Sequence, residues 1–322
     1  MRCENIAKNM KNKYIPEGML PKCESNKYFT SIEYLEKAKN EGIILFGRAL
    51  MCDINQNLIV ELGKFRGMIP RDEVNYSVDG SKAKDIAILT RVGKTVCFKI
   101  IGIDKKESGD IVPILSRREA QKECFNEYIS NLKAGDVVNA RVTHLENFGA
   151  FVDIGCGIIS MLSIESMSIS RISHPKDRFE VGQNIRVIIK TAVDEIGRII
   201  LSHKELLGTW EENACCFSVG ETVEGIVRSI ENYGVFVEIA PNLAGLAEYK
   251  TGTEVGNRVA VFIKSIIPEK MKLKLVLVDG GMHDVRLKEM KYFYNENHID
   301  EWQYSPPNCP KIVKVNFTSY ND

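Results

Sequence analysis

The sequence predicts a mainly β protein of three tandem five-stranded barrels joined by short α-helices. Segments 147–154 and 232–239 are two versions of one phrase, which establishes an internal repeat. Elsewhere the chain reads as short alternating strands between turns that contain Gly and Asn, a pattern typical of small β-barrels. The length of 322 residues has room for two to three ordinary domains.

The divisions of the chain follow from where the strand patterns begin and end. Residues 1–28 have little periodicity and are expected to form a mobile tail, and Thr30 or Ser31 can cap a short helix after it. The predicted divisions are an N-terminal tail and short helix (1–42), a divergent barrel (43–118), a linker helix (119–133), a second barrel (134–205), a second linker helix (206–218), a shortened third barrel (219–279) and a C-terminal tail (280–322).

The second repeat has the clearest strand pattern. Its expected strands are 137–145, 150–154, 158–162, 185–193 and 198–202. Five strands in so short a unit suit a closed Greek-key barrel of the OB type. The third repeat follows the same order with a shorter polar connection after its third strand. The first repeat is the most divergent.

The repeated phrase places aromatic rings on the solvent face of a strand. Alternation sends Val152 and its apolar neighbours into the core, which puts Phe151 on the side of Asp153. Phe236 takes the same position in the third repeat. A large ring on a charged face is an exposed apolar group that usually has a binding partner. Phe148 and Tyr233 precede these rings by three positions and complete one ring pair in each repeat. The alternative is that one ring of each pair seals a barrel end.

Composition restricts the class of protein. Lys+Arg and Asp+Glu both number 43, which counts against coating nucleic acid by bulk charge and leaves local basic sites possible. The nine cysteines include no C-x-x-C pair, and no apolar run approaches the length of a membrane span. The N-terminus lacks the layout of a signal peptide. We therefore expect a reduced, cytoplasmic protein without membrane contact.

Catalytic signatures are weak throughout the sequence. The five histidines are scattered without metal-ligand spacing, and no G-x-x-x-x-G-K-[ST] phosphate loop occurs. Carboxylates are spread over the repeats without a D-x-D-like cluster for two metal ions. The prediction is a protein that is not an enzyme and that uses no cofactor and no metal.

Four motifs in fixed order resemble the S1 RNA-binding domain, the repeat of the bacterial small-subunit ribosomal protein of that name. They are 148–152, 172–175, 181–183 and 194–202. The resemblance is strongest in the second repeat, good in the third and weak in the first. It implies S1-type OB barrels and a protein that binds single-stranded RNA, such as mRNA, in association with translation or the ribosome.

The resemblance also implies which side chains form the site. In the family, two aromatics, a histidine, an aspartate and an arginine share one barrel face. The second repeat matches four of the five, with Ser163 in place of the histidine. In the third repeat a lysine replaces the arginine, Pro268 replaces the aspartate and Glu248 replaces the histidine. In the first repeat, Gln56 and Ile59 stand at the ring positions.

Outward arginines and a locally basic loop add candidate phosphate contacts. The alternative for the loop is an ordinary solvated connection. The predicted RNA-binding residues are Phe148, Phe151, Arg141, Asp194, Arg198, Arg171, His174, Lys176, Arg178, Tyr233, Phe236 and Lys272. Asp194 is expected to act as a strut for a loop or an arginine, because a bare carboxylate repels RNA.

Two further functions compete with RNA binding. The first is an adaptor whose barrels mainly bind protein and which docks on the ribosome through its first barrel, the one without rings. The second is an RNA-processing enzyme, since such barrels accompany several exoribonucleases. Those enzymes need a separate catalytic domain, and three repeats with linker helices leave no space for one.

Overall fold

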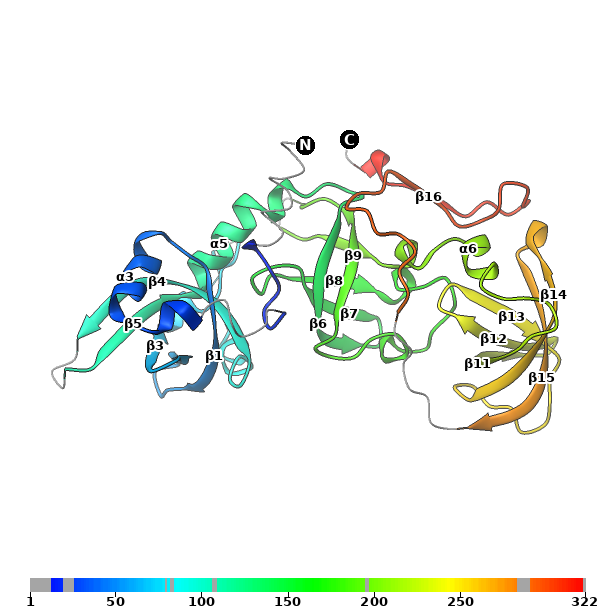
Figure 1. The fold of residues 1–322 in the computed structure, drawn as a ribbon, viewed down its shortest axis with the longest axis horizontal. Helices are drawn as coiled ribbons and strands as arrows, with labels where there is room; N and C mark the ends of the chain where they lie inside the picture. Colours follow the sequence, from blue (N-terminus) through cyan, green and yellow to red (C-terminus); the bar gives the residue numbers. More distant parts are fainter. Residues whose placement is uncertain are drawn as a thin grey trace.

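Three closed five-stranded barrels follow one another along the molecule (Figure 1). The computed structural model describes residues 13–19, 26–78, 80–81, 84–105, 109–194, 197–282 and 290–320. The first barrel lies at one end, the second in the middle and the third at the other end. The predicted fold class, mainly β with tandem OB-type barrels, is confirmed.

Each barrel repeats one topology. Its first three strands form an antiparallel meander, the third strand pairs in parallel with the fifth, and the fourth pairs with the first to close the barrel. This is the Greek-key order of the OB type. The strands of the first barrel are β1 Leu45–Cys52, β2 Leu58–Leu62, β3 Phe65–Ile69, β4 Thr95–Lys105 and β5 Ile111–Ser116; those of the second are β6 Val137–Glu146, β7 Gly149–Asp153, β8 Ile159–Ser163, β9 Asn184–Thr191 and β10 Ile200–Ser202; those of the third are β11 Thr222–Glu231, β12 Gly234–Ala240, β13 Leu243–Ala247, β14 Arg258–Ile267 and β15 Lys272–Met282.

Short helices join the barrels, and side-chain caps fix where several of them begin. Ser31 accepts a hydrogen bond from the backbone N–H of Tyr34, and Ser116 accepts one from that of Glu119. Such caps satisfy backbone donors that the first helical turn leaves free. The α-helices are α3 Ile32–Asn40, α4 Asp85–Leu89, α5 Arg117–Glu127 and α6 Trp210–Ala214, and short 3-10 helices cover Lys27–Phe29, Arg71–Glu73, Ile129–Asn131, Ile164–Ser166, Pro175–Asp177, Lys204–Leu207, Pro268–Lys270 and Thr318–Tyr320.

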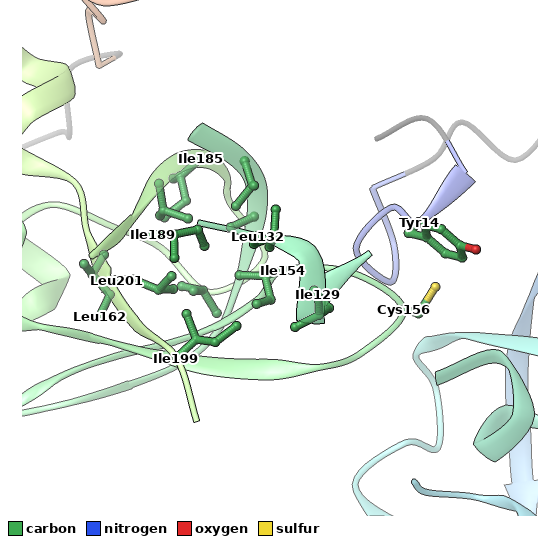
Figure 2. Packing of buried hydrophobic residues seen from close by; sticks show 14 of the residues in the cluster. Tyr14, Ile129, Leu132, Ile154, Cys156, Leu162, Ile185, Ile189, Ile199 and Leu201 are labelled. Carbon is green, nitrogen blue, oxygen red and sulfur yellow. The ribbon is translucent and has the colours of Figure 1, made fainter. Parts of the chain in front are cut away.

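Aliphatic side chains from successive strands fill the second barrel. Figure 2 shows Ile154, Leu162 and Ile185 converging with Ile189, and all four are buried. Leu132, from the segment that precedes β6, joins the same cluster. Alternation along each strand sends these residues inward and leaves their neighbours on the outer face, where a binding site can form.

Residues 13–19 pack between the first and second barrels, which corrects the expectation of a mobile tail for this segment. The Tyr14 ring is buried and stacks on Tyr128 with 5.8 Å between centroids. The backbone N–H of Cys156 donates to the carbonyl oxygen of Ile15 at 2.9 Å. The partners lie more than 100 positions away along the chain, so local sequence pattern could not have revealed them.

A buried ion pair anchors this segment. Arg117 Nε donates to Glu17 Oε1 at 2.7 Å, and the side chains are 0% and 7% exposed. Burial alone would raise the pKa of the Glu17 carboxyl, but the charge and hydrogen bonds of Arg117 outweigh it and hold that pKa below its usual value. The Glu17 backbone N–H donates to Asp153 Oδ2 at 2.7 Å. Burial, with a smaller contribution from the Glu17 charge, raises the pKa of Asp153 to about 7.

A second buried charge group joins the second and third barrels. Arg178 Nη2 lies 2.6 Å from Glu238 Oε2, and Arg228 Nε lies 2.7 Å from the same oxygen. All three side chains are almost fully buried. The carboxylate therefore needs both arginines, because a buried charge is stable only when it is paired and hydrogen-bonded.

The C-terminal segment ties the same two barrels together. Its two short strands, β16 Glu301–Gln303 and β17 Lys314–Asn316, pair with each other and lie beside the second and third barrels (Figure 1). Trp302 is buried in the hydrophobic cluster of the third barrel. Arg186 of β9 donates to the carbonyl oxygens of residues 294–296. Residues 290–320 thus form part of the packed structure.

No helix within the described part of the chain is long and apolar enough to cross a membrane.

Replacing Arg117 by alanine should destabilise the protein by about 3–5 kcal/mol, because the buried Glu17 carboxylate would lose its fully buried partner at 2.7 Å and keep only Arg91 at 3.5 Å. Arg118→Ala is the matched control. Its guanidinium pairs with Glu73 on the exposed surface, where such a pair contributes about 0–1 kcal/mol. Urea denaturation at neutral pH measures both losses. Similar losses for the two variants would show that the Glu17 pair does not hold the first two barrels together.

Candidate nucleic-acid interface

One row of side chains crosses the outer face of the second barrel. Strand pairing places His144 of β6 opposite Phe151 of β7, Phe151 opposite Met161 of β8, and Met161 beside Ile200 of β10. A β-bulge between Val142 and His144 turns the histidine onto this row. The row is half-buried to exposed, so it can contact a ligand.

The two ring pairs have the same geometry in both barrels. Phe148 and Phe151 lie edge to face with centroids 6.1 Å apart and planes at 90°. Tyr233 and Phe236 lie 6.1 Å apart at 88°. Phe148 is 55% exposed and Tyr233 67%. Neither of these two rings seals a barrel end, which removes that alternative for the first ring of each pair.

A glycine follows the first ring of each pair because the neighbouring strand is close. A Cβ atom on Gly149 would lie 2.5 Å from the carbonyl oxygen of Leu162, and one on Gly234 would lie 2.6 Å from that of Ala247. Gly234 also has a φ of +146°, which disfavours other residues. At Gly149 the close approach of β8 is the reason for the glycine, and positive φ plays no part.

His144 is a member of the site that the sequence analysis missed. Its ring lies nearly parallel to that of Phe151, with 6.4 Å between centroids and 26° between planes. Its Nε2 lies 2.8 Å from Glu146 Oε1. The resemblance placed the histidine position at Ser163, whose hydroxyl instead donates to that of Ser166. His144 reaches the outer face because of the β-bulge after Val142. No sequence pattern marks that bulge, so the position of His144 could not be predicted.

Asp194 positions Arg198 at one end of this face. Arg198 Nε donates to Asp194 Oδ2 at 2.9 Å, and the Arg198 backbone N–H donates to Asp194 Oδ1 at 2.7 Å. The Arg198 side chain is 73% exposed. It lies two residues before Ile200, in the segment that leads into β10.

Arg141 lies level with Asp153 across β6 and β7, at the Arg198 end. Its Nη1 donates to Asn184 Oδ1 at 2.6 Å. A Cβ atom on Gly18 would lie 3.2 Å from Arg141 Nε, so the N-terminal segment lines one side of this guanidinium. Arg141 remains half-exposed at the margin of the face.

The basic loop 171–178 faces the third barrel rather than the ring row. Its His174 caps the 3-10 helix Pro175–Asp177, with Nδ1 accepting from the Lys176 backbone N–H at 3.0 Å. Arg178 is buried against Glu238, so its predicted contact with phosphate is corrected to a role in joining barrels. Arg171 and Lys176 are exposed on this loop.

The third barrel carries the equivalent row with different charges. Ser229, Phe236, Leu246 and Lys274 are successive partners across β11, β12, β13 and β15. Lys272 precedes Lys274 by two residues and so occupies the place that Arg198 has in the second barrel. Both lysines are exposed. Lys272 was predicted from the sequence, and Lys274 was not.

The corresponding row of the first barrel is aliphatic. Met51, Ile59, Met68 and Ile114 are successive partners across β1, β2, β3 and β5. Ile59 therefore stands in the place of Phe151, as the repeat alignment predicted. None of these four side chains offers a ring with which a base could stack.

Among the residues that the structure describes, no group of three or more His, Cys, Asp or Glu side chains is placed to hold a metal ion.

The fold and the face together define a tandem array of OB-type barrels, two of which present paired rings at one position. The family description "S1 RNA binding domain" matches residues 131–204, which contain the whole second barrel. The match thus covers the second barrel from its first strand to its last.

The chain is also similar to ribosomal proteins over most of its length. It is 31% identical over 260 residues to the small ribosomal subunit protein bS1 homolog of Bacillus cereus, covering 79% of this chain and 65% of that one. It is 31% identical over 260 residues to bS1 of Staphylococcus haemolyticus, covering 76% and 64%. The chain thus spans slightly less than two thirds of the length of these relatives.

A solved multidomain protein with nucleic acid binding domains from Streptococcus pneumoniae overlaps 74% of each chain at 13% identity, with a TM-score of 0.25. That likeness is too weak to support any statement on arrangement or function.

Proposed function

We propose that this chain is a non-enzymatic protein that binds single-stranded RNA, including mRNA, on the ring face of its second barrel. The observation that carries the proposal is the edge-to-face ring pair on the outer face, formed by the exposed Phe148 and the half-buried Phe151. Each base stacked on an aromatic ring contributes roughly 1–3 kcal/mol, and stacking tolerates any base because every base has a π-face.

The neighbours of the rings fit the same ligand. The imidazole of His144 extends the flat surface beside Phe151, and Arg198 offers a guanidinium that can donate to phosphate oxygens. Asp194 holds that guanidinium in place. Because the net charge of the chain is zero, the second barrel should bind mainly by stacking, with little dependence on salt.

We place this activity in the cytoplasm, in association with translation. The relatives named above are small-subunit ribosomal proteins, and the matched domain is named for RNA binding. Three barrels in tandem give the chain three outer faces. This fits a protein that positions RNA for other components.

Replacing Phe148 and Phe151 together by alanine should weaken binding of a short oligouridine at least tenfold, because two stacking surfaces are lost. Alanine at Gln56 and Ile59, the matched positions of the first barrel, should change affinity less than twofold. Fluorescence anisotropy with the full chain measures both. Equal losses in the two variants would refute the second barrel as the principal site.

A second candidate function is an adaptor that docks on the ribosome through the first barrel. The aliphatic row of this barrel favours it, together with Ile54, which is 98% exposed in the turn after β1. Changing Met51 and Ile54 to glutamine should reduce co-sedimentation with ribosomes and leave oligouridine binding intact. Unchanged co-sedimentation would exclude this surface as the docking site.

A further inference from the structure

The hairpin of the fourth and fifth strands is longer in the third barrel than in the second. Its β14 and β15 are long, antiparallel strands joined by the 3-10 helix Pro268–Lys270. The corresponding β10 of the second barrel is the three-residue strand Ile200–Ser202. The β14–β15 hairpin therefore extends the outer face of the third barrel beyond the ring row.

This hairpin concentrates positive charge in a chain that is neutral overall. Between positions 258 and 278 the only acidic residue is Glu269. The exposed lysines of the hairpin are Lys264, Lys270, Lys272 and Lys274. Within the described residues, none of these four ammonium groups lies within ion-pair distance of a carboxylate, so all four are available to an anionic ligand.

Lys272 and Lys274 share one face with the rings. Lys274 is beside Leu246, which is opposite Phe236, so ring, aliphatic side chain and ammonium group follow one another across three strands. Lys272 lies two residues nearer the tip on the same side of β15. Glu248 is the residue just after β13. Its carboxylate would repel phosphate, but the four lysines outnumber it.

In the described part of the second barrel, the basic residues of β9 and β10 are Arg186 and the half-buried Lys190. Arg186 of β9 is used to bind the carbonyl oxygens of residues 294–296. Arg198 is paired with Asp194. The second barrel is thus equipped for stacking, and the third for contact with a polyanion.

We propose that the β14–β15 hairpin is a binding surface for the sugar-phosphate backbone of single-stranded RNA and supplies most of the salt dependence of RNA binding by this chain. This rests on the proposed RNA-binding function. The second barrel carries the stronger family resemblance, but the third barrel would make the larger electrostatic contribution to binding. Stacking on the second barrel and ion pairing on the third then act as separate contributions.

Counterion release makes the proposal measurable. For single strands, each neutralised phosphate contributes about 0.7 to the slope of log affinity against log salt. Changing all four lysines to glutamine should therefore lower that slope by about 2–3. The matched control changes the exposed Lys39, Lys84, Lys94 and Lys122 to glutamine, which removes equal charge from other surfaces.

The experiment titrates a fluorescent 12-nucleotide oligouridine with the full-length chain at several salt concentrations. The expected result is a shallower slope and at least tenfold weaker binding at low salt for the hairpin variant, with the wild-type slope in the control. Arginine at the same four positions should restore the slope, since it keeps the charge. Circular dichroism shows whether each variant is folded.

The outcomes separate this inference from the proposed function. If the hairpin variant keeps the wild-type slope while the Phe148/Phe151 variant loses affinity, the hairpin proposal is overturned and the function stands. If the control loses as much slope as the hairpin variant, diffuse charge explains the effect and the hairpin proposal fails. If the wild-type chain does not bind oligouridine, both are overturned.

Discussion

Buried charge at the joints between barrels is the constraint on which the arrangement of this protein depends. Glu17 and Arg117 meet between the first and second barrels, and Glu238 meets two arginines between the second and third. Ionised groups removed from water are stable only in one set of partners and geometry. The barrels are thereby held in defined positions, and so are the outer faces they carry.

Within each barrel, one strand topology delivers one row of outward side chains, and the chemistry of that row differs along the chain. The first row is aliphatic, the second holds Phe151 beside an imidazole, and the third ends in Lys274. Three barrels with the same backbone topology thus present three chemically different outer faces. We infer that they serve different contacts: protein, stacked bases and phosphates.

The sequence predicted the features that depend on local pattern. Alternation in the repeated phrase placed Val152 inside and Phe151 outside, and the structure agrees because strand periodicity alone decides the face. Alternation alone would have put Phe148 on the side of Val152, and its exposure depends on its place before β7 begins at Gly149. The strand order of the barrels could also be predicted, because the repeated sequence pattern folds into the same topology in each copy.

Features that depend on distant partners could not be predicted. Arg178 was assigned to phosphate because its partner Glu238 is 60 positions away, and sequence gives no measure of that proximity. Residues 13–19 lacked periodicity because their contacts lie in other barrels. His144 was missed because a single bulged residue reverses the face of every position after it.

The central claim is that RNA contacts the ring faces of the second and third barrels and leaves the first barrel free. Photocrosslinking of oligo-4-thiouridine to the full-length chain, with the attached peptides identified by mass spectrometry, tests this directly. The account predicts crosslinks to peptides that contain Phe148 and Phe151 and to those with Tyr233 and Phe236. Crosslinks concentrated in the first barrel, residues 45–116, would contradict it.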